Sequence, residues 1–210
     1  MIGTGYVGLV SGTCFADLGN KVYCVDKDIK KINKLNSGFS PIYEPGLEEL
    51  IKKNFLAKRL SFTNNVKNAI NASDIIFICV GTPTKNGTFD VDLSFINQCV
   101  KEILKYSKKR KIIVTKSTVP VGTGDKIEKL LKKKRKLFTL VSNPEFLREG
   151  EAIRDFRFPD RIIIGSNEKK VFNIMKKLYS PLISKGAKFF TTSRRGAELI
   201  KYASNAFLAT

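Results

Sequence analysis

The sequence has no histidine and only four cysteines among its 210 residues. Without histidine the commonest general base is absent, so acid–base chemistry must fall to Glu, Asp, Lys or bound water. The cysteines form no Cys-x-x-Cys pair, and with no histidine beside them they predict no metal site. They are Cys14, Cys24, Cys79 and Cys99. Their apolar surroundings predict small, buried side chains in a reducing compartment.

Long apolar runs are also missing. No stretch reaches the roughly 20 residues that a membrane-spanning helix needs, so no membrane partner is expected. Met1 and Ile2 lead straight into a glycine turn, and no secretory signal is visible before it. These two absences predict a cytoplasmic protein.

Acidic residues are scarce, because 19 Asp and Glu stand against 38 Lys and Arg, for a net charge of +19. This excess is compatible with an anionic partner, such as nucleic acid, a membrane surface or a phosphorylated ligand. The alternative is a lysine-rich solvated surface. The dense basic runs, residues 108–111 and 132–136, fall at the ends of predicted helices, where cations complement the helix dipole. No recognition motif accompanies them, so we expect no nucleic-acid partner.

Short β-branched runs alternate with longer helical stretches. The continuous runs are typical of strands buried on both faces of a parallel sheet. Strands are predicted at residues 21–26, 75–80, 111–115, 138–141, 161–164 and 186–191. Helices are predicted at residues 6–18, 27–36, 46–55, 93–107, 124–133, 169–179 and 196–210. The alternation predicts an α/β fold with a Rossmann-like, doubly wound, mostly parallel sheet.

The expected domain organisation is a dinucleotide-binding domain over residues 1–193 and the start of a long central helix over residues 194–210. A first strand of this fold normally supplies about five residues before the first glycine. Only Met1 and Ile2 precede Gly3, so the first strand is expected to be truncated.

The segment Gly3-Thr4-Gly5-Tyr6-Val7-Gly8 has the Gly-x-Gly-x-x-Gly spacing of a dinucleotide-binding turn. Gly3 would permit the tight turn, Gly5 would let the backbone approach a pyrophosphate, and Gly8 would let the next helix pack closely. That helix would direct its first amides at the phosphates. Asp26 follows 18 residues after Gly8, where an acid accepts the ribose hydroxyls and repels a 2′-phosphate. We therefore expect NAD as the cofactor; the alternative is an ordinary glycine turn with a solvent aspartate.

Two loops follow predicted strands, at the sheet edge where ligands bind in open α/β folds. Residues 80–84 contain Thr82 and Pro83, and residues 116–123 contain Thr118. The hydroxyl groups of these loops are suited to orienting water or cofactor. The equally simple alternative is a pair of polar turns.

Residues 143–150 form a third such loop. Glu145 and Glu149 stand there beside Phe146 and Leu147, which places two carboxylates in apolar surroundings suited to base work. The alternative is a helix-capping segment in which Glu149 pairs with an arginine.

Lys201 and Asn205 are four residues apart on the last predicted helix and therefore share one face. An amine and an amide together suit a sugar hydroxyl, a carbonyl or a developing oxyanion. Taken alone, Lys201 is better explained as a surface lysine.

Together these segments resemble the UDP-glucose/GDP-mannose dehydrogenase family, over essentially the whole chain. The matching segments, in order, are residues 3–26, 40–47, 80–84, 116–122, 145–150 with 159–161, and 198–209. The resemblance implies oxidation of the C6 alcohol of UDP-glucose to the carboxylate in two NAD-dependent steps, through a thioester on a cysteine. It also implies a homodimer or a higher homo-oligomer.

The resemblance further implies roles for single residues. The NAD contacts would be Gly3, Gly5, Tyr6, Val7, Gly8, Asp26, Lys31, Thr82, Pro83, Thr118 and Glu149. The sugar site would be lined by Glu145, Phe146, Leu147, Arg148, Glu149, Lys201 and Asn205. Thr118 and Glu145 would handle the water, and Lys201 and Asn205 would stabilise the oxyanions.

Two parts of the family pattern are absent from these residues. They are the Gly-Gly-Ser-Cys-Phe-Pro-Lys-Asp stretch with the nucleophilic cysteine, and the UDP-binding second domain. The chain is therefore expected to be a fragment that is inactive alone. Three alternatives stay open: a dehydrogenase of GDP-mannose, a dehydrogenase of UDP-N-acetyl sugars, and a non-catalytic NAD-binding remnant.

Overall fold

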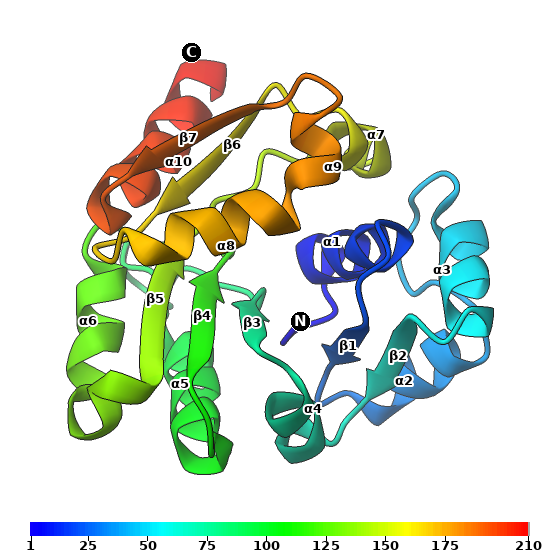
Figure 1. Ribbon diagram of the computed structural model, residues 1–210, viewed down its shortest axis with the longest axis horizontal. Helices are drawn as coiled ribbons and strands as arrows, with labels where there is room; N and C mark the ends of the chain where they lie inside the picture. Colours follow the sequence, from blue (N-terminus) through cyan, green and yellow to red (C-terminus); the bar gives the residue numbers. More distant parts are fainter. Residues whose placement is uncertain (210) are drawn as a thin grey trace.

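The structure is a computed structural model that describes residues 1–209, in which helices and strands alternate along the chain (Figure 1). The elements are α1 (Tyr6–Asp17), β1 (Val22–Val25), α2 (Ile29–Asn36), α3 (Leu47–Leu56), β2 (Leu60–Thr63), α4 (Val66–Ala72), β3 (Ile75–Ile78), α5 (Ser94–Tyr106), β4 (Lys111–Thr115), α6 (Thr123–Leu130), the 3-10 helix η1 (Lys132–Leu137), β5 (Phe138–Ser142), α7 (Ala152–Arg157), β6 (Arg161–Gly165), α8 (Lys170–Leu178), α9 (Ser180–Ile183), β7 (Lys188–Thr192) and α10 (Arg194–Ala209).

The strands form two parts that one residue joins. β3 to β7 lie in sequence order in a five-stranded part, and β1 pairs with β2. Ile2 pairs in parallel with both Val25 of β1 and Ile78 of β3. All strand pairings are parallel except that of β5 with β6. The predicted doubly wound, mostly parallel α/β fold is therefore confirmed.

Met1 and Ile2 occupy the position of the first strand. The Ile2 amide donates to the carbonyl of Phe77, and the Cys79 amide donates to the carbonyl of Ile2, both at 2.8 Å. On the other side the Val25 amide donates to the carbonyl of Met1, also at 2.8 Å. These bonds place the glycine turn at the carboxyl edge of the sheet, between β1 and β3.

The core has two layers, one on each face of the sheet. Successive residues of a strand point to opposite faces, so in β4 Ile113 belongs to one apolar cluster and Val114 to the other. The Val114 cluster contains the centre of α1, where Phe15 meets the rings of Phe77 and Phe156 with centroids 5.3 and 5.0 Å apart. α1 is thus buried from Gly8 to Ala16.

Several boundaries differ from the prediction. Strand β2 and helices α4, α7 and α9 were not predicted. The helix expected at 124–133 ends at Leu130, and α10 begins at Arg194, two residues earlier than expected. Thr210, the last residue of that prediction, lies outside the described residues. Among the described residues no helix is long and apolar enough to cross a membrane.

Candidate active site

The glycine turn leads from Ile2 into α1. Gly3 has a φ of +96°, and a Cβ there would come within 2.7 Å of the Cys79 carbonyl oxygen. A Cβ on Gly8 would lie 2.0 Å from the carbonyl oxygen of Gly3. A Cβ on Gly5 would meet no protein atom within 4 Å, and Gly5 has an ordinary extended φ of −68°. The fold therefore requires Gly3 and Gly8, whereas Gly5 leaves open space at the start of α1 that a ligand can use.

Asp26 lies beside this turn, just after β1. One of its oxygens, Oδ2, accepts hydrogen bonds from the Thr4 amide (3.0 Å) and hydroxyl (2.7 Å), and Lys31 Nζ lies 3.2 Å away. Burial raises the pKa of Asp26, but the hydrogen bonds from Thr4, the Asp28 amide and Lys31 outweigh it and lower the pKa to about 2. Asp26 is thus a fixed negative charge next to the turn.

The loops after β3 and β4 are bonded to each other. The Thr82 hydroxyl donates to the Thr118 carbonyl at 2.8 Å, and the Ser117 hydroxyl donates to the Val80 carbonyl at 2.6 Å. Thr82 and Thr118, predicted separately, are therefore neighbours at the carboxyl edge of the sheet. Pro83 lies exposed beside them.

The loop after β5 is anchored by Asn143. Its amide nitrogen donates to the Ile163 carbonyl at 3.0 Å, and its amide oxygen accepts from the Tyr179 hydroxyl at 2.5 Å. Asn143 is 2% exposed, so both bonds are shielded from water. Asn143 therefore fixes the start of the loop that carries the Glu145 carboxylate.

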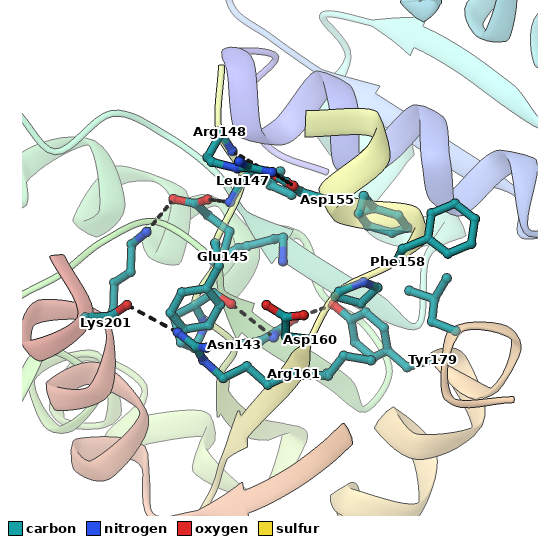
Figure 2. A pocket seen from close by; sticks show the side chains of 18 of the residues that line it. Asn143, Glu145, Leu147, Arg148, Asp155, Phe158, Asp160, Arg161, Tyr179 and Lys201 are labelled. Carbon is teal, nitrogen blue, oxygen red and sulfur yellow. Dashed lines mark hydrogen bonds and ion pairs between the residues drawn. The ribbon is translucent and has the colours of Figure 1, made fainter. Parts of the chain in front are cut away.

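Glu145 and Lys201 form an ion pair across the pocket. Glu145 Oε1 lies 3.1 Å from Lys201 Nζ, and both side chains are about nine-tenths buried. The second oxygen, Oε2, accepts from the Leu147 amide at 2.6 Å. Figure 2 shows Lys201 reaching from α10 toward Glu145, while Arg148 turns away toward Asp155. The structure thus brings together a predicted carboxylate and a predicted amine that are far apart in the sequence.

An aromatic wall lies between two cations. The Arg161 guanidinium stands 4.6 Å and the Lys201 amine 5.3 Å from the centroid of the Phe146 ring. The pocket has a volume of about 500 Å³, and its lining includes Leu147 and Asn205. Its mixture of an aromatic face, cations and a carboxylate suits a polar, anionic ligand such as a sugar phosphate.

Lys116 was not predicted as a site residue, yet it lines the same pocket. It directly follows β4 and is 5% exposed. Burial lowers the pKa of its amine, and the nearby charge of Lys201 lowers it further, while Glu145 opposes the change. Its position after a strand was the one available signal.

Helix α10 is locked onto α6, which the sequence did not reveal. The buried carboxylate of Glu198 accepts hydrogen bonds from the amides of Gly122 (2.7 Å) and Gly124 (2.8 Å), at the start of α6. Arg194, 2% exposed, pairs with Asp125 at 2.9 Å and also with Glu128. These contacts fix the position of α10 on α6, and Lys201 of α10 lies opposite Glu145 as a result.

Some predicted residues lie outside the pocket lining. Glu149 is exposed and lies near the Tyr6 hydroxyl, whose pKa its charge helps to raise. Thr118 is half-buried and lies at the bonded loops after β3 and β4. All four cysteines are buried and unpaired, as predicted, and none lines the pocket.

The fold, the turn with Asp26 and the adjoining pocket define a dinucleotide-binding domain of a dehydrogenase. The chain belongs to the UDP-glucose/GDP-mannose dehydrogenase family, because the NAD binding domain of that family matches residues 1–183. The resemblance inferred from the sequence is confirmed.

Individual relatives agree with this assignment. The UDP-glucose 6-dehydrogenases of Rhizobium meliloti (strain 1021) and Bacillus subtilis (strain 168, TuaD) are 50% and 51% identical over 213 residues. These alignments cover 100% of this chain but 49% and 45% of the relatives. The chain thus spans about half the length of the curated relatives it matches.

Solved structures are similar over the same portion. A ternary complex of GDP-mannose dehydrogenase from Pseudomonas aeruginosa superposes with a TM-score of 0.92 at 38% identity. A UDP-glucose dehydrogenase from Pyrobaculum islandicum gives 0.93 at 36% identity. Each match covers 99% of this chain and 49% of the other.

Proposed function

We propose that the protein containing this chain oxidises the C6 alcohol of UDP-glucose to the carboxylate of UDP-glucuronate in two NAD-dependent steps. The observation that carries the proposal is the buried pair of Glu145 and Lys201, in a pocket at the same sheet edge as the glycine turn. The names of relatives about 50% identical over the whole chain support UDP-glucose as the substrate.

The nucleotide turn fits NAD. The open space at Gly5 and the uncapped first turn of α1 suit a pyrophosphate. The ionised carboxylate of Asp26 would accept the ribose hydroxyls and repel the additional phosphate of NADP. When bound, NAD supplies a hydride acceptor. The other proposed contacts with NAD are made by Tyr6, Val7, Lys31, Thr82, Pro83, Thr118 and Glu149.

The pocket residues have complementary roles. The Lys201 ammonium, with Asn205 one helical turn further along, would stabilise the oxyanion that develops at C6. Glu145, whose carboxylate is held by the Leu147 amide, would orient a water and accept its proton. Thr118 would hold the same water. Phe146 and Leu147 would form the wall that faces the sugar, with Arg148 at the edge of the pocket. Glu149 lies outside the pocket lining, so its proposed contact with the sugar rests on the family resemblance alone.

The proposal extends to the whole protein. We propose residues 1–193 as the NAD-binding domain and residues 194–210 as the start of a helix that leads to a UDP-binding domain. We further propose a homodimer or a higher homo-oligomer and a cytoplasmic location. GDP-mannose is the second candidate substrate, because a GDP-mannose dehydrogenase shares the fold at 38% identity.

Isothermal calorimetry with NAD and NADP tests the cofactor site. We expect the chain to bind NAD and to discriminate strongly against NADP. Asp26→Asn should lower the affinity for NAD by about tenfold to a hundredfold, which corresponds to the loss of one hydrogen bond to a charged group. The ratio of the affinities for NAD and NADP should fall as well. The control is Asp28→Asn, which alters the exposed N-cap of α2. Equal affinity of the wild-type chain for NADP would refute the assignment.

Ligand-observed NMR with UDP-glucose and with GDP-mannose tests the substrate. We expect saturation transfer to the C6 protons of UDP-glucose, and its loss in Lys201→Met. Transfer only to GDP-mannose would support the second candidate instead.

A further inference from the structure

Glu44 is a buried carboxylate that neither the fold nor the proposed chemistry explains. It lies in the segment between α2 and α3 and is 7% exposed. Its backbone is held, because its carbonyl accepts from the Leu47 amide at 3.1 Å as α3 begins. A buried carboxylate is costly unless its oxygens accept hydrogen bonds, so its partners are informative.

Three segments that are remote in sequence meet at this carboxylate. Glu44 Oε2 accepts a hydrogen bond from the Tyr6 hydroxyl and another from the Gly150 amide at 3.0 Å. Oε1 accepts from the Ile153 amide at 3.1 Å. The Gly150 amide also donates to the Tyr6 hydroxyl oxygen at 2.6 Å. Both oxygens of Glu44 are therefore used, and their partners belong to the glycine turn, the end of the sugar-site loop and the first turn of α7.

The partners stand at functional positions. Tyr6 is the first residue of α1 and part of the glycine turn, so its backbone moves with the proposed pyrophosphate site. Gly150, with a φ of +87°, ends the loop that carries Glu145. Ile153 lies in the first turn of α7. Burial and then the bond to Glu44 raise the pKa of Tyr6 to about 12, so its hydroxyl stays a donor at neutral pH.

We propose that Glu44 is a positioning residue that couples occupancy of the glycine turn to the order of the loop over residues 145–150. This inference rests on the proposed function. A nucleotide on the turn immobilises the backbone of Tyr6, and through Tyr6 and Glu44 it holds the amides of Gly150 and Ile153. The loop then presents Glu145 to Lys201, and because coupling is reciprocal, a sugar in the pocket tightens the nucleotide.

Amide hydrogen exchange of this chain, with and without saturating NAD, tests the coupling. We expect NAD to slow exchange at Gly150 and Ile153 on the order of tenfold in the wild type. In Tyr6→Phe the Glu44 bonds to both amides remain but the link to the turn is cut, so the slowing should fall below about twofold. In Glu44→Gln the NAD-induced slowing at Gly150 and Ile153 should be reduced to the same extent as in Tyr6→Phe. Occupancy is confirmed by calorimetry for each variant, and the amide of Ile113 in β4 reports global stability.

The outcomes separate this inference from the proposed function. Binding of NAD without slowing at Gly150 and Ile153 overturns the coupling and leaves the cofactor assignment intact. Slowing in Tyr6→Phe as large as in the wild type also overturns it, because a purely structural Glu44 would give that result. No NAD binding by the wild type overturns both. If Glu44→Gln does not fold, Tyr6→Phe still decides.

Discussion

At the scale of the residue, the amine of Lys116 is the most informative group that the sequence did not mark. It is buried at the end of β4, within the electrostatic reach of Glu145 and Lys201. A buried amine resists protonation because an ammonium ion loses its hydration there. The pocket therefore contains a lysine whose pKa is lowered by burial beside a lysine that is paired with a carboxylate.

Lys116 makes stability depend on pH in a defined direction. Its pKa in the folded chain is below the ordinary value of 10.5, so the unfolded chain binds this proton more readily. The free energy of unfolding must then rise with pH between the folded pKa and about 10.5. In Lys116→Met this rise is absent, and the variant should be more stable at neutral pH by ~1 kcal/mol.

Urea unfolding at about pH 7 and about pH 9 measures this contribution. The gain in unfolding free energy between the two pH values should be larger in the wild type than in Lys116→Met. Lys126→Met, at an exposed position of α6, is the matched control and should follow the wild type. A gain in Lys116→Met equal to that of the wild type would contradict a lowered pKa of Lys116 in the folded chain.

At the scale of the element, the site depends on how α10 sits on α6. Glu198 supplies the acceptor that the first amides of α6 lack from their own segment, since no side chain caps that helix. An anionic acceptor also complements the positive end of the helix dipole. The two helices thus behave as one unit, and Lys201 is placed by that unit.

Glu198→Ala should lower the free energy of unfolding by ~2 kcal/mol, because the buried Gly124 amide and the half-buried Gly122 amide lose their acceptor. Glu198→Gln should cost less, since its amide oxygen still accepts one bond. Urea denaturation of both, with the exposed Glu49→Ala as control, measures the effect. If Glu198→Ala is as stable as the control, the contact does not lock α10.

The elements predicted from the sequence are those with a strong local signal. The β-branched run of β4 was predicted with its observed bounds of residues 111–115. β2 was missed because its four residues alternate buried and half-buried positions in a polar context. α7 has only six residues and follows directly on a loop. The reversed direction of β6 leaves no periodic signal, because side-chain alternation is the same in either direction.

The site was predictable to the extent that it consists of fixed spacings. The glycine turn and Asp26 follow such a spacing, and each stands where the chain was expected to place it. Glu145 and Lys201 could be joined only through the family resemblance, because they lie on remote segments. Glu44 and Glu198 carry no local signal, and Lys116 carries only its position directly after β4. Their roles arise from partners that tertiary packing brings together.

At the scale of the whole molecule, apolar surface gathers at the end of the chain. Leu199 and Leu208 of α10 are 56% and 84% exposed. Figure 1 shows α10 next to the sheet, where it packs against β6 and β5. This end of the described chain is therefore a natural place for further protein surface to pack.

The chain alone should not complete the oxidation to a carboxylate. Burial raises the pKa of Cys24 to about 11 and those of Cys14, Cys79 and Cys99 to about 12, and none lines the pocket. With no thiolate available, the thioester step has no nucleophile. Incubation with NAD and UDP-glucose should yield no sustained NADH absorbance. Calorimetric binding of NAD by the same sample shows that the protein is folded, and continuous NADH production would contradict the expectation.

The three glycines of the turn meet two different requirements, one set by the fold and one set by a ligand. Changes at Gly3 or Gly8 would damage the fold itself, so any lineage that keeps this domain must keep them. Position 5 has an ordinary backbone conformation and free space, and so folding alone would tolerate a side chain there. In a lineage that had lost its nucleotide, position 5 would be free to drift before positions 3 and 8. The glycine at position 5 of this chain leaves its space open to a ligand, whereas the glycines at positions 3 and 8 are required by the fold itself.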